Sequence, residues 1–304
     1  IYTLSLHDAL PISSLFIGNV LVRNLVSLGY PIRLLINPST ETPRLPPGLA
    51  VDVAISGFDD ERSVRASLKG VKTIFHLIGT ESRGIHYDFE RVDIRSTRIL
   101  AELGREMGIE RFFYLSHLGA DRHSAYPYLK AKALSEAAIV DSGVPYTILR
   151  TAAVYGKQDH FTEVFARYLR AFPRFVPIPG DGSAKVQPLW VDDLATCLLL
   201  CFEDEKKAFT TVTVGGMESL TVEEIFLMIM EELKIQKRLL RISPVWHRQL
   251  VIAMEQWFPK FPRIYFWTDY LAEDRITGID VLPREFSLVP TRLSRNLSYL
   301  SERG

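Results

Sequence analysis

The sequence has few cysteines, no net charge and no long apolar run, and each of these absences argues against a class of protein. Its 304 residues contain only two cysteines, and lysine plus arginine balance aspartate plus glutamate at 36 each. Proteins that bind nucleic acid by neutralising phosphates carry an excess of basic residues, so the absence of net charge argues against that class. No apolar run reaches the roughly 18 residues that a membrane-spanning helix needs. What remains is a globular protein whose 47% apolar residues suffice for a packed core.

The few cysteines and histidines give no metal-ligand pattern. Cys197 and Cys201 lie in one apolar helical stretch, LATCLLLCF, where core packing is the expected role. A metal site would need further ligands at short spacing, and the seven histidines are not placed in that way. We therefore predict no metal site, and we interpret the chain as a cytoplasmic protein of a reducing compartment.

What the sequence does have is an alternation of strand-like and helix-like segments. The strand-like runs are almost continuously apolar, which is typical of a parallel sheet covered by helices on both faces. We predict an α/β fold with a doubly wound parallel sheet, in which ligands bind at the carboxyl ends of the strands. The expected strands are 32–36, 49–55, 71–78, 111–115 and 144–149, and the expected helices are 60–68, 87–107 and 128–140.

The composition changes after the middle of the chain. We therefore divide it into a sheet domain at 15–156 and a smaller mixed α/β lobe at 157–304. Thr221 and Glu224 have the spacing of a capping box. The stretch 243–271 is rich in Trp, Phe and Pro, and we interpret it as a helix that covers the core and ends in a proline bend. A surface for a membrane or a quinone-like substrate is the alternative. Helices are expected at 161–171, 192–202 and 222–233.

The most informative stretch is 111–156. An apolar strand is followed by Ser116, and a helix then opens with Tyr128 and Lys132 four residues apart. Side chains at i and i+4 share a helix face, so the lysine ammonium can lie below the phenol oxygen. A tyrosine has an ordinary pKa of about 10, and a nearby cation in a cleft of low dielectric lowers the pKa of such a phenol. The two residues are therefore a candidate general acid/base pair.

Two alternatives stay open for this pair. Tyr126 and Lys130 have the same spacing, although Pro127 suits a first helical turn and favours Tyr128 with Lys132. Tyrosine and lysine are also common on solvated helix faces, so the spacing by itself is a weak signal. Its position between a strand that ends in serine and a second apolar strand is what strengthens it.

The beginning of the chain does not fit the rest. A dinucleotide-binding unit opens with a strand and a glycine-rich turn, and Gly18 fits the last glycine of a G-x-x-G-x-x-G turn. The two earlier glycine positions are Ile12 and Leu15, whose side chains would fill the phosphate site. We expect residues 1–14 to be adapter-derived sequence in place of the natural first strand. The alternative is a natural variant with a decayed site, and in either case we predict poor dinucleotide binding.

Taken together, these pieces resemble the atypical short-chain dehydrogenase/reductases. Among them, the chain is most similar to NmrA-like proteins related to an accessory subunit of respiratory complex I. The resemblance extends from residue 16 to about residue 300, and it implies a Rossmann-type sheet with NAD or NADP along its carboxyl edge. The matching motifs are FIG at 16–18, GVKTIFHLIG at 70–79, RFFYLSHLGAD at 111–121, YLKAKALSE at 128–136, YTILRTAAVYG at 146–156, PGDGSAKVQPLWVDDLA at 179–195 and GGMESLTVEEI at 215–225.

The resemblance also implies roles for individual residues. Tyr128 would exchange the substrate proton, Lys132 would lower the pKa of that phenol and hold the nicotinamide ribose, and Ser116 would orient the carbonyl. Asn37 stands where NADP-preferring relatives often carry arginine and NAD users an acidic residue. It therefore does not indicate which of the two cofactors is bound. The implied cofactor-binding residues are Ile17, Gly18, Asn37, Leu77, Gly79, Lys132, Ala152 and Val154.

Two functions follow from the resemblance. The first is an NAD(P)-dependent oxidoreductase or epimerase that acts on a small or quinone-like carbonyl substrate. The second is a non-catalytic nucleotide-binding sensor, assembly factor or membrane-complex subunit. In the second case we expect contact with a membrane surface or with a respiratory complex. The sequence does not indicate an oligomeric state.

Overall fold

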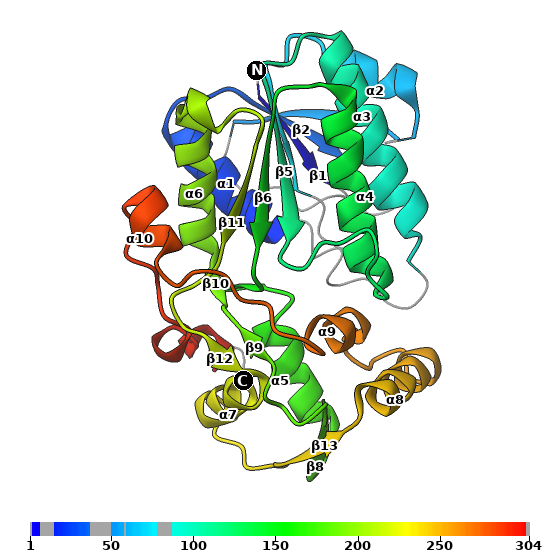
Figure 1. The fold of residues 1–304 in the computed structure, drawn as a ribbon, viewed down its shortest axis with the longest axis vertical. Helices are drawn as coiled ribbons and strands as arrows, with labels where there is room; N and C mark the ends of the chain where they lie inside the picture. The colour runs from blue at the N-terminus through cyan, green and yellow to red at the C-terminus, as the bar shows by residue number, and fades with distance from the viewer. Residues whose placement is uncertain (1, 7–14, 37–49, 58, 78–86, 302–304) are drawn as a thin grey trace. The chain divides into compact units, whose positions relative to one another are not determined.

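The computed structural model describes residues 2–6, 15–36, 50–57, 59–77 and 87–301. A sheet of seven strands has the order β11-β6-β5-β4-β1-β2-β3 (Figure 1). The pairs β1–β2, β1–β4, β2–β3 and β4–β5 are all parallel, which confirms the predicted doubly wound α/β fold. The direction of strand addition reverses between β1 and β4, where folds of this kind bind their ligands. The strands are β1 Tyr2–Leu6, β2 Ile32–Ile36, β3 Asp52–Ile55, β4 Thr73–His76, β5 Arg111–His117, β6 Tyr146–Thr151 and β11 Thr210–Val214.

Helices cover both faces of this sheet. Figure 1 shows α1 and α6 on one face and α2, α3 and α4 on the other. Successive side chains of a strand point to opposite faces, so neighbours on β5 pack against different helices. Phe112 joins the core below α3 and α4, whereas the ring of Phe113 lies 6.3 Å from that of Phe202 on α6. The helices are α1 Leu15–Ser27, α2 Glu61–Ser67, α3 Ser96–Glu106, α4 Pro127–Ser142 and α6 Val191–Glu203, with short helices η1 Glu90–Arg95 and η2 Glu205–Lys207.

The start of the chain forms a strand of the sheet, and the replacement of the natural first strand by residues 1–14 stays a prediction. Tyr2–Leu6 forms β1 and pairs on both sides, with Ile32–Ile36 and with Thr73–His76. The physical reason is that two parallel neighbours offer backbone donors and acceptors on both sides, and a short segment without proline can fill that position. Of the expected glycine turn, Ile12 lies outside the described residues, whereas Leu15 is the first residue of α1.

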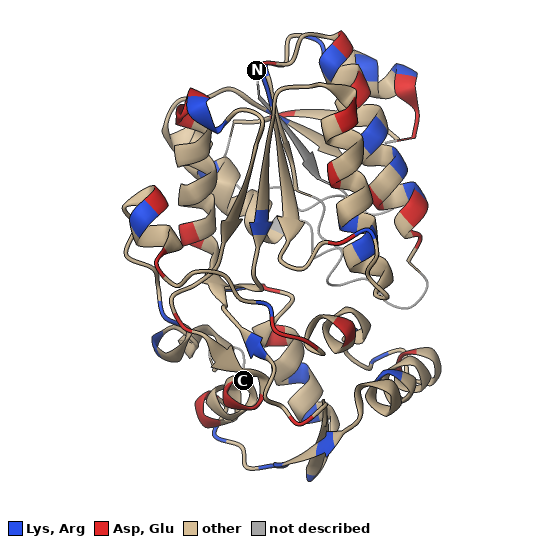
Figure 2. Ribbon diagram, in the orientation of Figure 1, with Lys and Arg blue, Asp and Glu red and all other residues tan. Residues whose placement is uncertain are grey.

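Two strands differ from their predicted form. β5 runs to His117, so Ser116 lies inside the strand and does not end it. β3 has mostly exposed side chains, although its sequence predicted a covered strand. It is the last strand of the sheet and has a neighbour on only one side, so less of it is covered. Charged residues of both signs are interspersed along α2, α3 and α4, while the strands of the sheet are largely uncharged (Figure 2).

The chain divides into two compact units, and the division differs from the predicted boundary at residue 156. Unit 1 comprises Ile1–Gly79, Asp88–Arg150 and Ala195–Thr213, and unit 2 comprises the rest. The segment 195–213 belongs to unit 1 because α6 packs on the sheet and β11 is hydrogen-bonded to β6. The elements of unit 2 are β7 Val154–Tyr155, α5 Thr162–Ala171, β8 Phe175–Pro179, β9 Lys185–Val186, β10 Leu189–Trp190, β12 Leu220–Thr221, α7 Val222–Glu232, β13 Arg238–Ile242, α8 Pro244–Trp257, α9 Tyr265–Tyr270, α10 Val281–Phe286, η3 Leu293–Arg295 and η4 Ser298–Leu300.

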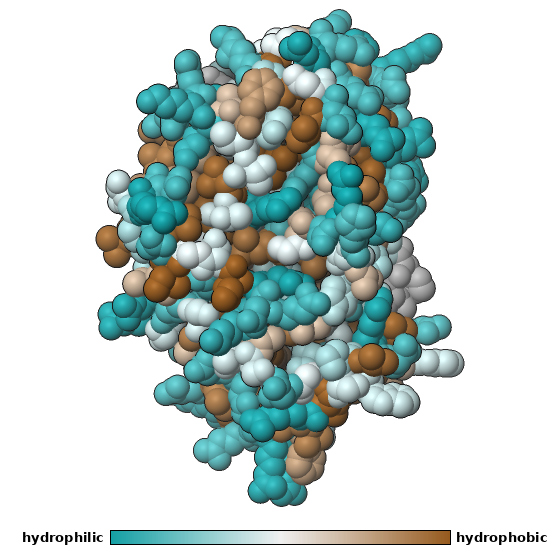
Figure 3. All heavy atoms as spheres, in the orientation of Figure 1, coloured by the Kyte–Doolittle hydropathy of each residue, from teal (hydrophilic) through white to brown (hydrophobic). Residues whose placement is uncertain are grey.

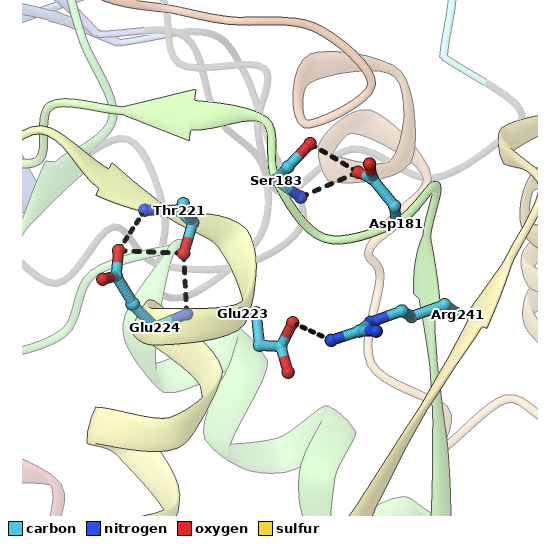
Figure 4. A network of polar contacts seen from close by, with 6 residues as sticks. All are labelled: Asp181, Ser183, Thr221, Glu223, Glu224 and Arg241. Atoms are coloured by element: carbon cyan, nitrogen blue, oxygen red, sulfur yellow. Dashed lines mark hydrogen bonds and ion pairs between the residues drawn. The ribbon is translucent and has the colours of Figure 1, made fainter.

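Local polar contacts fix the start of α7 in unit 2. The predicted capping box is present, because Thr221 Oγ1 accepts from Glu224 N at 3.2 Å and Glu224 Oε2 accepts from Thr221 N at 2.7 Å (Figure 4). One residue away, Glu223 pairs with Arg241 of β13 at 2.7 Å. These contacts fix α7 next to the two-stranded sheet of β8 and β13.

On the face shown in Figure 3, hydrophilic residues predominate and apolar ones form small separate groups. None of the helices in the described part of the chain combines the length and the hydropathy that crossing a membrane requires.

Candidate active site

Helix α4 positions the predicted acid/base pair. The helix begins at Pro127, so Tyr126 precedes it as the N-cap residue. Tyr128 is 4% exposed and Lys132 is completely buried, whereas Lys130 is exposed. Only the pair at 128 and 132 therefore lies on the buried face of α4.

Aromatic rings surround the phenol of Tyr128. The ring of His117, at the end of β5, lies 5.3 Å from the Tyr128 ring in an edge-on arrangement. The ring of Phe89, just before η1, lies 6.1 Å away. The ammonium nitrogen of Lys132 is 5.7 Å from the centre of the Tyr128 ring and 5.0 Å from that of Tyr114. The lysine therefore lies between two phenols and can make cation–π contacts with both.

Lys132 also contacts a backbone carbonyl and a carboxylate, and the carboxylate was not predicted from the sequence. Its Nζ donates to the carbonyl oxygen of Leu115 at 3.2 Å, and it lies 3.9 Å from Oδ1 of Asp93. Asp93 is completely buried and belongs to η1, a π-helical segment that leads directly into α3. Its position could have been found by extending the buried positions Thr97 and Leu100 of α3 back by one turn.

A second polar contact lies one helical turn from Asp93. Thr97 Oγ1 is 2.9 Å from Nε2 of His76, the last residue of β4, and both side chains are completely buried. The His76 ring stacks at 5.6 Å on the Tyr114 ring. Burial, with a smaller contribution from the charge of Asp93, raises the pKa of Tyr114 well above its usual value, so Tyr114 stays neutral.

Ser116 lies two residues beyond Tyr114 on β5, so the pleat places both side chains on the same face of the sheet. This is the face covered by α3 and α4, and Ser116 is completely buried there. Unit 1 thus brings Ser116, Tyr128 and Lys132 to one region of the sheet. The arrangement can transfer a proton through the phenol, next to a fixed positive charge.

Three of the predicted cofactor residues lie at the start of α1 and at the end of β4. Gly18 is buried in the first part of α1, and Ile17 is partly buried beside it. The first turn of α1 contains no acidic residue, so its positive end can accept a pyrophosphate. Leu77, just after β4, is buried. Asn37 and Gly79 lie outside the described residues.

The two remaining predicted cofactor residues belong to unit 2. Ala152 is completely buried, and its N–H donates to the carbonyl of Val214 at 3.0 Å. Val154 opens β7 and is partly buried. Their backbone is therefore held by pairing within unit 2. In the described part of the chain, no group of three or more His, Cys, Asp or Glu residues could hold a metal ion.

Comparison with known proteins identifies relatives in respiratory complex I. The alpha subcomplex subunit 9 of mitochondrial NADH dehydrogenase (ubiquinone) from Arabidopsis thaliana is 29% identical over 217 residues, which cover 69% of this chain and 54% of the relative. The chain thus spans about half the length of this curated relative.

Solved structures share the fold. Triphenylmethane reductase of Citrobacter sp., solved with NADP(H), matches with a TM-score of 0.71 and 16% identity over 99% of each chain. UDP-glucose 4-epimerase of Thermus thermophilus, solved with NAD, matches with a TM-score of 0.62 and 20% identity over 89% of this chain and 99% of the epimerase. The NAD(P)H-binding family pattern matches residues 16–167. With the fold and the residues described above, this match shows that the chain belongs to the NAD(P)H-binding family, whose cofactor is NAD or NADP.

Proposed function

We propose that the chain is an NAD(P)-dependent oxidoreductase or epimerase that acts on a small or quinone-like carbonyl substrate. The observation that carries this proposal is the placement of Tyr128 and Lys132 on the buried face of α4, beside the carboxyl end of β5. Relatives of the same fold are reductases and epimerases, which agrees with chemistry at a carbonyl or alcohol carbon.

Three residues of the chain would take part in transferring the proton that accompanies the hydride. When bound, the nicotinamide supplies or accepts a hydride. Tyr128 gives its phenolic proton to the carbonyl oxygen during reduction and takes it back during oxidation. Lys132 stabilises the phenolate through its positive charge, and Ser116 donates a hydrogen bond that orients the carbonyl.

Tyr128→Phe tests this proposal. The substitution removes the phenolic oxygen, and we expect single-turnover hydride transfer to fall by about a hundredfold or more, because general acid/base catalysis typically contributes that much. Tyr126→Phe is the matched control, since it makes the same chemical change two residues away, outside the buried face of α4. Both variants are made in a chain whose glycine turn is repaired by Ile12→Gly with Leu15→Gly, because we expect the unchanged chain to bind the dinucleotide poorly. The measurement is the rate of nicotinamide absorbance change in a stopped-flow instrument with a panel of carbonyl substrates. Equal rates in the two variants would remove Tyr128 from the mechanism.

A second candidate function is that of a non-catalytic nucleotide-binding subunit of a membrane complex, as the relatives in respiratory complex I are subunits. A specific feature of α8 favours it. Trp246 is 73% exposed and Trp257 is 75% exposed. The two tryptophans are eleven residues apart, close to three helical turns, so they lie on the same side of the helix. Val245 and Phe258 extend this exposed apolar surface at its two ends.

The charges around α8 suit an anionic membrane surface. Glu255 is the single acidic residue of α8, and its carboxylate accepts from the N–H groups of Ile264 and Tyr265, both at 2.8 Å. The exposed residues Lys260 and Arg263 follow the helix. Tryptophan side chains favour the headgroup region, and basic residues are attracted to anionic lipids. We therefore infer that this α8 surface, defined by Val245, Trp246, Trp257 and Phe258, binds an anionic membrane surface.

A further inference from the structure

The buried ion pair of Asp93 and Lys132 has a consequence for the proposed chemistry. We propose that Asp93 is a positioning residue that keeps the Lys132 ammonium protonated in a dry part of unit 1. Lys132 can then act on Tyr128 and on the nucleotide ribose at neutral pH. That consequence rests on the proposed function, whereas the pairing of the two charges can be tested without it.

The surroundings of Lys132 show why an anion is needed. Its side chain is completely buried, and burial without a counter-charge favours the neutral amine. The carbonyl of Leu115 at 3.2 Å and the rings of Tyr114 and Tyr128 contribute partial charges but no full negative charge. Asp93, with its Oδ1 at 3.9 Å, supplies the full charge.

The backbone around Asp93 fixes its direction. Asp93 lies in η1, whose π-helical turn is wider than an α-helical one, and such turns often occur at functional sites. Ser96 donates to the carbonyl of Val92, and Thr97 contacts His76. The helix is therefore held to β4 one turn after the residue that carries the carboxylate.

Other titratable groups near the pair do not replace Asp93. On α4, Glu136 is paired with Arg150, whose Nε lies 2.9 Å from Oε1. Burial raises the pKa of Tyr114 on β5, so this phenol carries no charge at neutral pH. Nearby, the His76 ring stacks on the Tyr114 ring and the His117 ring lies edge-on to the Tyr128 ring. Asp93 is the carboxylate that the structure places within ion-pair distance of the Lys132 ammonium.

A double-mutant cycle tests the pairing. Asp93→Asn and Lys132→Met each leave one buried charge without its partner, so each should lower the midpoint of denaturant unfolding markedly. The double variant has neither charge, so it should be more stable than the sum of the two single effects predicts. Glu90→Gln on η1 and Lys130→Met on α4 are matched controls at exposed positions, and their effects should be small and additive.

The pH dependence separates a charge role from mere packing. In Asp93→Asn, the folded state holds an unpartnered buried lysine with a lowered pKa, so the unfolded state binds more protons and the deficit in stability shrinks as pH rises. In Lys132→Met, the buried carboxylate of Asp93 has a raised pKa in the folded state, so the deficit shrinks as pH falls. Opposite slopes between about pH 5 and pH 9 are the expected result. Additive effects with parallel pH profiles would overturn the proposal.

The two proposals can fail independently. Coupling in the cycle combined with full turnover in Tyr128→Phe would refute the enzymatic function and leave the ion pair in place. Loss of turnover in Tyr128→Phe combined with an additive cycle would refute the role of Asp93 and leave the enzymatic function in place.

Discussion

At the scale of single residues, Asp159 of unit 2 combines burial with an unusual number of donors. It is 2% exposed and lies just before α5. Its oxygens accept hydrogen bonds from the hydroxyl of Thr162 at 2.6 Å and from that of Tyr299 at 3.1 Å. Three backbone N–H groups, those of residues 156, 161 and 163, donate to it at 2.9–3.0 Å. Asp159 therefore ties the end of the chain to the loop before α5.

The ionisation of Asp159 should make stability depend on pH. Burial raises its pKa from 3.8 to about 6, although the hydrogen bonds oppose this shift. Between these two values the folded state binds more protons than the unfolded state, so this group's contribution to stability falls as pH rises from about 4 to 6. In Asp159→Asn this contribution is absent. The measurement is the free energy of unfolding in urea of the variant minus that of the unchanged chain, at each pH. We expect this difference to rise in favour of the variant by about 2–3 kcal/mol between pH 4 and pH 7.

The Asn variant also loses acceptor capacity at every pH, so it should be the less stable protein at pH 4. A difference in stability that stays constant across this range would contradict the raised pKa. Tyr299→Phe removes one donor to the carboxylate, and its own loss of stability should grow as pH rises, because a charged carboxylate depends more on that hydrogen bond than a protonated one.

At the scale of elements, most helices and strands of the sheet could be predicted from local patterns. The capping box at Thr221 and the Pro127 start of α4 depend on neighbouring residues, so they are visible in the sequence. β11 was not predicted, although its residues Thr210–Val214 are all β-branched and alternate from Thr211 onward. Its place beside β6 depends on pairing with a strand far back in the chain, which the local sequence does not show. The π-helical turn of η1 was not predicted, and the buried position of Asp93, one turn before Thr97, was missed although the spacing of the α3 positions indicates it.

The α8 surface leads to a prediction at the same scale. The double substitution Trp246→Gln with Trp257→Gln should weaken sedimentation with vesicles that contain phosphatidylserine by about tenfold or more, because it removes the largest exposed apolar side chains of the helix. Val289→Gln is the control, since Val289 is 90% exposed at a distant place in the chain. Vesicles of phosphatidylcholine alone should bind the unchanged chain less well. Equal binding of both vesicle types, or of both variants, would argue against a lipid-binding surface.

At the scale of the whole molecule, the doubly wound parallel sheet followed from the alternation of strands and helices, while the site did not follow completely. Tyr128, Lys132 and Ser116 could be selected because a strand and a helix are adjacent in the sequence. Asp93 reaches Lys132 from a different helix, and only the packing of η1 against α4 shows this. The division into two units also depends on packing, because the segment 195–213 joins the sheet from far along the chain.

The last prediction concerns the nucleotide path at the start of the chain. The family pattern begins at residue 16, whereas the glycine turn expected before it has Ile12 and Leu15 at two of its three glycine positions. Side chains there would occupy the space through which the backbone approaches a pyrophosphate, and a β-branched residue resists the backbone conformations such a turn needs. We expect the combined variant Ile12→Gly with Leu15→Gly to bind NADH or NADPH at least about tenfold more tightly than the unchanged chain in calorimetric titrations.

A matched control tests whether the gain in nucleotide affinity comes from the turn itself. Leu28→Gly, at an exposed position near the other end of α1, removes a similar side chain and should leave the affinity for either nucleotide unchanged. Unfolding midpoints of all variants show whether a loss of binding comes from a loss of folding. Micromolar binding by the unchanged chain would show that Ile12 and Leu15 do not obstruct the phosphates. The nucleotide preferred by the glycine variant would then decide between NAD and NADP, because Asn37 carries neither the positive charge that favours the 2′-phosphate nor the carboxylate that favours the ribose hydroxyls.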